Sequence, residues 1–269
     1  INYICSIFLN PTHKNAMKYL QLKQQMFIKN RELLKEKIKK TSIAIFNSND
    51  VMPTNSDGTL PFIQNSDLFW LSGIDQEESV LLLFFDSEKN KTKEVLFLKE
   101  TNEHIAIWEG AKLTKDEAYA VSGIKEVYWL SDFENMLSSI VHKVDCVYLN
   151  QNIHSRSSNK VQTRDDRFRL FFKKYYPAKK IKEIAPIMHD LRVIKSKPEV
   201  ELIQKACDIT ERGFKRILSF IKPGVMEYEI EAELIHEFIS SRSSRFAYQP
   251  IIGSGRNSCV LHYIDNNKM

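Results

Sequence analysis

A histidine near the end of the chain is the residue whose type and surroundings most strongly suggest chemistry. His262 stands in the segment "GSGRNSCVLHYIDNN", between Leu261 and Tyr263. An imidazole titrates near neutral pH and can therefore exchange a proton with a reacting group. A histidine between two apolar side chains is also a common half-buried packing residue. His262 alone therefore does not decide between a catalytic and a structural role.

The other histidines show no metal-ligand pattern. No pair has the H-x-x-x-H or similar spacing that would bring two imidazoles to one metal ion. These residues are His13, His104, His142, His154, His189 and His236. Their spacing predicts no histidine-based metal site.

Two glycines shortly before His262 raise a separate question. Gly253-Ser254-Gly255 is not G-x-S-x-G, because one residue alone separates the glycines, so it does not indicate a hydrolase nucleophile elbow. It is also too short for a dinucleotide-binding fingerprint, and no helix-forming segment follows it. We therefore predict a tight turn that needs a positive φ.

The first part of the chain alternates short apolar runs with helical segments and polar loops. This alternation favours an α/β layer architecture. The predicted strands are 41–46, 79–85, 94–99, 127–130 and 145–150, and the predicted helices are 29–40, 114–121, 132–142 and 165–176.

The pattern becomes strongly helical from Ser196 onward. Ser196 and Glu199 form a capping-box signature, and apolar residues then recur at helical spacing until Pro223-Gly224 ends the helix. A second helix is predicted to start near Glu227. The apolar run 246–252 is predicted to be a strand that enters the glycine turn.

Composition limits the class of protein. The 269 residues include 39 Lys+Arg and 34 Asp+Glu, and the formal net charge of +5 is spread along the chain. A dedicated nucleic-acid binder concentrates its basic residues, so no nucleic-acid partner is expected. No apolar stretch approaches the ~20 residues that span a membrane. The four cysteines form no CxxC pair and the apolar start lacks a basic region, which favours a cytoplasmic protein without a signal peptide.

Several motifs together resemble one family. R-x-I-K-S-x-x-E in "LRVIKSKPEVELIQ", K-P-G-x-x-E-Y-E in "IKPGVMEYEIEAELI" and G-S-G-x-N-x-x-x-L-H-Y at 253–263 stand in the order found in pita-bread metallopeptidases. Upstream, "LPFIQNSDLFWLSGIDQEESVLLL" and the W-x-G of "IWEGAKLTKDEA" resemble the amino-terminal domain of the same family. The chain resembles the Xaa-Pro aminopeptidase (aminopeptidase P) branch from about Met17 to its last residue. It departs from the family at "SSRSSRFAY", where relatives usually carry a glycine.

The resemblance implies a fold and a domain organisation. We expect an α/β (α+β) chain with a creatinase-type N-terminal domain, in which helices flank a mixed, ribonuclease H-like sheet. The first part of a pita-bread domain follows. Residues 1–16 are expected to be an upstream or vector-derived segment before a native start at Met17. Residues 17–187 would form the N-terminal domain, and 188–269 an incomplete N-terminal part of the catalytic domain. Such a part would expose apolar surface that missing strands should cover.

The resemblance also implies a chemistry. Family members hydrolyse the N-terminal Xaa-Pro bond of peptides with two divalent metal ions, often Mn²⁺, held by two aspartates, one histidine and two glutamates. A metal-bridging hydroxide attacks the carbonyl carbon. The matching ligands are expected beyond Met269, so no metal ligand is assigned here and the 269-residue chain is expected to be inactive alone. Asp265 is too close to His262 to be the first metal aspartate.

Five residues receive roles from this resemblance. His262 matches the histidine beside the metal centre, and would donate a proton to the leaving proline nitrogen or hydrogen-bond the carbonyl oxygen. Tyr248, Ile252 and Tyr263 are expected to be pocket walls. Trp108, in the W-x-G segment, would line the active site of a neighbouring subunit, because intact members are expected to form homo-dimers or tetramers. Burial in the core is the alternative for Trp108, since that is the common fate of tryptophan.

Two other functions stay open. Prolidase (Xaa-Pro dipeptidase) or creatinase activity shares the pita-bread fold, and the residues that would distinguish it are expected mostly past Met269. Other pita-bread domains have lost their metals and bind peptides or proteins. The retained L-H-Y segment argues against this second alternative, because a binding module needs no proton donor there.

Overall fold

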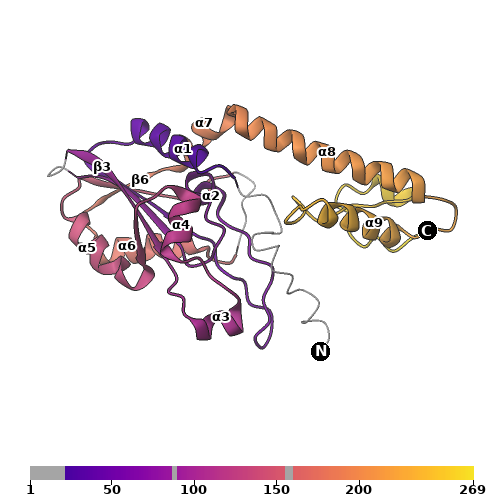
Figure 1. Cartoon of the computed structure of the whole chain (residues 1–269), viewed down its shortest axis with the longest axis horizontal. Helices are drawn as coiled ribbons and strands as arrows, with labels where there is room; N and C mark the ends of the chain where they lie inside the picture. The colour runs from indigo at the N-terminus through magenta and orange to yellow at the C-terminus, as the bar shows by residue number, and fades with distance from the viewer. Residues whose placement is uncertain (1–21, 87–89, 155–159) are drawn as a thin grey trace. The chain divides into compact units, whose positions relative to one another are not determined.

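A computed structural model describes residues 22–86, 90–154 and 160–269 (Figure 1). The expectations for residues 1–16 and for a start at Met17 lie outside the described residues. The described chain forms two compact units, residues 22–194 (the amino-terminal unit) and residues 195–269 (the carboxy-terminal unit). No helix of the described residues is both long and apolar enough to cross a membrane.

A six-stranded mixed sheet forms the centre of the amino-terminal unit (Figure 1). The strand order is β4-β3-β2-β1-β5-β6. Strand β2 runs antiparallel to both its neighbours, β1 and β3, and the other neighbouring pairs are parallel. The strands are β1 Ser42–Asn47, β2 Val80–Asp86, β3 Lys91–Leu98, β4 Glu126–Trp129, β5 Cys146–Leu149 and β6 Lys180–Glu183.

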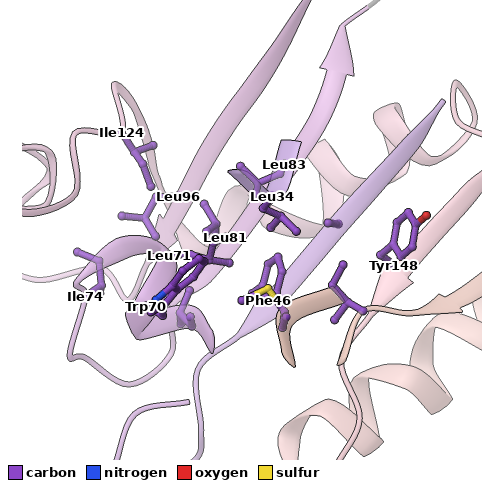
Figure 2. Packing of buried hydrophobic residues seen from close by; sticks show 14 of the residues in the cluster. Leu34, Phe46, Trp70, Leu71, Ile74, Leu81, Leu83, Leu96, Ile124 and Tyr148 are labelled. Atoms are coloured by element: carbon purple, nitrogen blue, oxygen red, sulfur yellow. The ribbon is translucent and has the colours of Figure 1, made fainter. Parts of the chain in front are cut away.

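Helices cover both faces of this sheet. Alternate residues of each strand point to opposite faces, and the apolar side chains on each face pack against helices. Phe46 of β1 belongs to a cluster that includes side chains of α1, α2, α4 and α7, whereas Ile45 belongs to a cluster with α5 and α6. Figure 2 shows the first cluster, in which Phe46 lies near Leu34 and Leu71. The helices are α1 Gln24–Lys37, α2 Ser66–Ser72, α3 Glu103–Glu109, α4 Lys115–Ser122, α5 Phe133–Val141, α6 Arg164–Tyr175 and α7 Ala185–Val193. The predicted α/β architecture with a mixed sheet and flanking helices is confirmed.

The segment 178–194 contains two elements that the sequence pattern does not reveal. "KIKE" forms the edge strand β6, although it has one apolar residue, because it pairs in parallel with β5. Helix α7 follows and buries Met188, which is 1% exposed, in the first cluster. A domain boundary at 187/188 would fall inside α7, whereas the compact units divide at 194/195.

The carboxy-terminal unit begins with two helices that pack together, α8 Lys197–Phe220 and α9 Glu227–Ser240. The predicted capping box is present, since the amide and hydroxyl of Ser196 donate to the Glu199 carboxylate at 2.7 and 2.6 Å. Gly213, the buried residue of α8, allows close packing, because a Cβ there would lie 3.1 Å from side-chain carbons of Leu234 and Phe238. Both helices start where the sequence predicts.

The rest of this unit departs from the prediction. The predicted strand 246–252 is wrong: these residues form a bend and irregular backbone, because no strand of this unit lies beside them to pair with their amides. Much of the apolar stripe on α8 is exposed, as expected for a helix with one packing partner. The exposed fractions are 52% for Val200, 48% for Ile203, 59% for Phe214 and 74% for Leu218, and Ile221, which directly follows the helix, is 52% exposed.

Candidate active site

The two glycines before His262 lie in the predicted tight turn, and glycine is required at each position for a different reason. Gly255 has a φ of +50°, in the left-handed region that favours glycine. Gly253 is required by space, because a Cβ there would lie 2.9 Å from the carbonyl carbon of Asn257 and 3.0 Å from the Ser258 nitrogen. A short 3₁₀ helix, η4 (Gly255–Cys259), continues the turn, although the sequence indicates no helix-forming residues there.

Glu227, the first residue of α9, holds residues 248–269 (the terminal segment) at three points. Its Oε1 accepts hydrogen bonds from the Ser254 amide at 2.5 Å and the Ser254 hydroxyl at 2.7 Å. Its Oε2 accepts from the Tyr263 hydroxyl at 2.6 Å and the Lys268 amide at 2.9 Å. The Glu227 amide also donates to the Lys268 carbonyl at 2.8 Å. Glu227, which is 1% exposed, therefore ties residues on both sides of His262 to one helix.

These donors keep Glu227 ionised. Burial favours the neutral carboxyl, but the hydrogen bonds from Tyr263, Ser254 and Lys268 outweigh it and lower the pKa of Glu227 to about 2. The positive end of the α9 dipole favours the same negative charge. Burial and the Glu227 carboxylate raise the pKa of Tyr263, so this phenol stays protonated and donates.

A second acidic residue on α9 holds the terminal segment through Asn266. The side-chain amide of Asn266 donates to Glu231 Oε2 at 2.8 Å and to the Pro250 carbonyl at 3.2 Å. Its Oδ1 accepts from the Ile252 amide at 3.1 Å. Asn266 is 1% exposed and has a φ of +47°, a conformation that asparagine tolerates better than most residues. The chain before the glycine turn and the chain after His262 are thereby joined to each other and to α9.

The predicted site residues of this unit have different surroundings. Tyr263 is 9% exposed, and its hydroxyl is occupied by Glu227, whereas Ile252 is partly buried beside the Asn266 amide network. Tyr248 is 76% exposed. His262 is exposed, and within the described residues its imidazole makes no hydrogen bond or ion pair. The structure therefore brings Ile252 and Tyr263 into one network and leaves the His262 imidazole accessible to a ligand.

Trp108 belongs to the amino-terminal unit and lies on the short helix α3. It is 79% exposed, which excludes the alternative that it is a core residue of this chain. Side-chain ion pairs join the end of α3 and the residues after it to preceding parts of the chain: Lys99 with Glu109, the last residue of α3, at 2.9 Å, and Lys112 with Glu77 at 2.5 Å. An indole displayed on a tethered helix is available for contact with another molecule.

The described residues do not fit a metal centre. Among them, no group of three or more His, Cys, Asp or Glu side chains is placed to hold a metal ion. The two carboxylates of α9 that contact the terminal segment, Glu227 and Glu231, already accept hydrogen bonds from its donors. No catalytic step through a metal follows from these residues.

Sequence reasoning missed the roles of Glu227 and Asn266 in this site, and of their partners Glu231 and Ser254. Glu227 is the first glutamate of the K-P-G-x-x-E-Y-E motif, and a glutamate at a helix start predicts a favourable dipole interaction at most. Its partners Ser254 and Lys268 lie 27 and 41 residues further along the chain, so no local pattern reports them.

Comparisons with known proteins place both units in one family. The model for the aminopeptidase P N-terminal domain matches residues 27–148, and the model for metallopeptidase family M24 matches residues 201–269. The Xaa-Pro aminopeptidase of Escherichia coli K12 is 28% identical over 248 residues, which cover 91% of this chain and 56% of that protein. This chain belongs to the Xaa-Pro aminopeptidase family of pita-bread metallopeptidases.

Solved structures of the Xaa-Pro aminopeptidase family agree with this assignment. A structure from Bacillus anthracis, described as a candidate aminopeptidase P, is 29% identical with a TM-score of 0.84, covering 92% of this chain and 59% of that one. Zinc-substituted aminopeptidase P of E. coli in complex with product is 27% identical with a TM-score of 0.78, covering 93% and 57%. The chain thus spans little more than half the length of these relatives.

Proposed function

We propose that the protein is a Xaa-Pro aminopeptidase, which releases the first residue of peptides that have proline in the second position. The observation that carries this proposal is the order of the two family matches. An aminopeptidase P N-terminal domain precedes an M24 segment that contains the exposed His262, and the relative that covers 91% of the chain is named for this activity. Peptides are thus the proposed partners.

His262 is proposed to act on the departing proline. The nitrogen of a Xaa-Pro bond carries no hydrogen, so it must gain a proton in order to leave as an amine. An exposed imidazole can deliver this proton, or donate a hydrogen bond to the carbonyl oxygen as negative charge develops there. Tyr263, the next residue, is held by Glu227, which restricts the backbone that carries His262.

The proposed activity needs two divalent metal ions, and manganese suits the ligand set of carboxylates and one imidazole that the family implies. Such a centre supplies an activated water and polarises the scissile carbonyl. No described residue is assigned to either ion, because none of them forms a metal-binding group.

The remaining proposals concern the substrate pocket, the oligomeric state and the cellular location of the protein. Tyr248, Ile252 and Tyr263 are proposed as walls of the substrate pocket. The exposed Trp108 supports a homo-oligomer in which this indole lines the active site of a neighbouring copy. The described cysteines Cys146, Cys207 and Cys259 are free thiols, which supports the proposed cytoplasmic location.

The substrate proposal is tested with the product of the complete gene, loaded with Mn²⁺. We expect release of the first residue from an Xaa-Pro-Xaa tripeptide, and none from the matched Xaa-Ala-Xaa tripeptide. A chelator should abolish the activity and added Mn²⁺ should restore it. Preference for the Xaa-Pro dipeptide would indicate a prolidase instead. Peptide binding without hydrolysis, measured by calorimetry, would indicate a binding module, and either result would overturn the proposal.

A further inference from the structure

The carboxylate of Glu227 lies at the centre of the terminal segment. It accepts four hydrogen bonds, two from Ser254 before His262 and one each from Tyr263 and Lys268 after it. Two carboxylate oxygens offer about four lone-pair sites, so this set of donors fills the acceptor capacity of an ionised glutamate. A glutamine of the same size would turn its NH₂ group toward one pair of donors.

Besides Glu227, the backbone around His262 is anchored through Asn266, four residues further along the chain. After η4 ends at Cys259, the chain to residue 269 has no helix or strand that would order it through regular hydrogen bonds. Val260, Leu261 and Ile264 are at least half exposed. The buried ring of Tyr263 and its hydroxyl bond to Glu227 are therefore the anchor nearest to His262 along the chain.

We infer that Glu227 is a positioning residue for His262, which acts by holding Tyr263 and the glycine turn so that the imidazole faces the substrate in one orientation. This inference rests on the proposed function. Glu227 touches no reacting atom in this role. Misplacement of a catalytic group by about 1 Å can cost about a hundredfold in rate, so the loss of such an anchor should be visible in kcat.

The test uses Glu227→Gln in the complete, Mn²⁺-loaded protein with an Xaa-Pro-Xaa peptide. We expect kcat to fall by about 10- to 100-fold with a smaller change in KM. Glu229→Gln is the matched control: it removes a charge from the same turn of α9, and its side chain can still accept the Met226 amide. Activity of this control should stay near that of the wild type.

A double-mutant cycle separates positioning from general damage. In the His262→Ala background, Glu227→Gln should cause little further loss, because there is no imidazole left to position. An equal further loss in that background would show a role independent of His262 and overturn the inference. Tyr263→Phe keeps the ring and removes one hydrogen bond, so it should show a weaker loss with the same dependence on His262 even if Glu227→Gln folds poorly.

A second measurement does not depend on activity. NMR of the protein with labelled histidine should show one sharp set of His262 imidazole signals in the wild type, and broadened or multiple signals in Glu227→Gln. Unchanged signals in Glu227→Gln would overturn the inference even if the wild type proves inactive. Inactivity of the wild type toward Xaa-Pro peptides would instead contradict the proposed function, so the two failures are distinct.

Discussion

Two acidic side chains of this chain, Glu227 and Asp165, respond to their surroundings in opposite directions. Burial opposes the charge of both. Four donors outweigh burial at Glu227, whose pKa falls to about 2. At Asp165 the side-chain amides of Asn47 and Asn65 donate at 2.9 and 3.4 Å, but burial and the negative charge of nearby Asp67 raise the pKa to about 6. The number of donors that reach a buried carboxylate therefore decides its ionisation here.

Replacing Asp165 with asparagine should change the pH dependence of stability. The folded chain holds this proton up to about pH 6, whereas the reference value of the free side chain is 3.8, so the free energy of unfolding falls as pH rises between these values. Asp165→Asn lacks this titration. Relative to the wild type it should gain roughly 1–3 kcal/mol between pH 4 and pH 7.5, measured by urea unfolding. A parallel pH dependence in the two proteins would contradict this.

Asp116→Asn provides the control for that comparison. Asp116 is also a first-turn aspartate of a helix, α4, but its side chain is exposed to water. The difference in unfolding free energy between this variant and the wild type should stay nearly constant over the same pH range.

His262→Ala is the direct test of the catalytic assignment. In the complete enzyme we expect turnover to fall by ~10²–10⁴-fold, the usual range for a lost acid–base group. Metal content, measured by atomic absorption, should be unchanged because His262 is not assigned as a ligand. Wild-type turnover in this variant would remove His262 from the mechanism.

At the scale of elements, capping residues and glycines set the ends of the helices around the first cluster. Asn65 accepts from the amides of Asp67 and Leu68 at the start of α2. Gly73 and Gly123 end α2 and α4 in the left-handed conformation, with φ of +72° and +75°. The two glycines have nearly the same left-handed backbone conformation but different neighbouring side chains. Substitutions at these two positions can therefore be compared directly.

Gly73→Ala should destabilise the protein more than Gly123→Ala. Either substitution lowers the free energy of unfolding by about 1–2 kcal/mol, because alanine disfavours the left-handed backbone conformation. At Gly73 the new methyl group would also overlap the ring of the fully buried Phe27, whereas at Gly123 it would meet the flexible end of Ile28 at 2.7 Å. Overpacking of a core costs a further ~1–3 kcal/mol, so we expect a total of about 3 kcal/mol for Gly73→Ala by urea unfolding. Equal costs for the two variants would contradict this packing argument.

Two segments that sequence reasoning missed or misplaced, β6 and 246–252, share one property. The local sequence of each segment does not indicate whether a neighbouring strand is available for pairing, and that neighbour decides whether the segment forms a strand. β6 has one apolar residue and becomes a strand because β5 is beside it. The run 246–252 has the composition of a strand but has no strand of its unit to pair with. Strand β2 was predictable because it is apolar from Val80 to Phe85 and ends in a single charged residue, Asp86. A strand that is buried on both faces carries apolar residues at nearly every position.

At the scale of the whole molecule, the two units differ in how much apolar surface they bury. The amino-terminal unit buries a cluster on each face of its sheet. In the carboxy-terminal unit, Gly213 is the buried residue of α8, and the core described for the chain includes Tyr263 but no large aliphatic side chain from this unit. Hydrophobic burial, which drives folding, is therefore concentrated in residues 22–194.

Residues 22–194 expressed alone should fold and unfold cooperatively in urea. Residues 195–269 expressed alone should give a broad transition and bind a hydrophobic dye, because most of the α8 apolar stripe is exposed. Circular dichroism and dye fluorescence would check both outcomes. Cooperative unfolding of residues 195–269 alone would show that this unit has a sufficient core of its own.

The sequence by itself determined the family, the α/β class and most strands and helices, and it identified His262 as the candidate catalytic residue. It could do so because motifs and periodicity are local properties of the chain. Tertiary structure alone decided what surrounds His262. It placed Glu227 against Ser254, Tyr263 and Lys268 and left the imidazole exposed. The physical reason is that hydrogen bonding and burial depend on residues brought together from distant parts of the chain, and neither can be read from spacing along it.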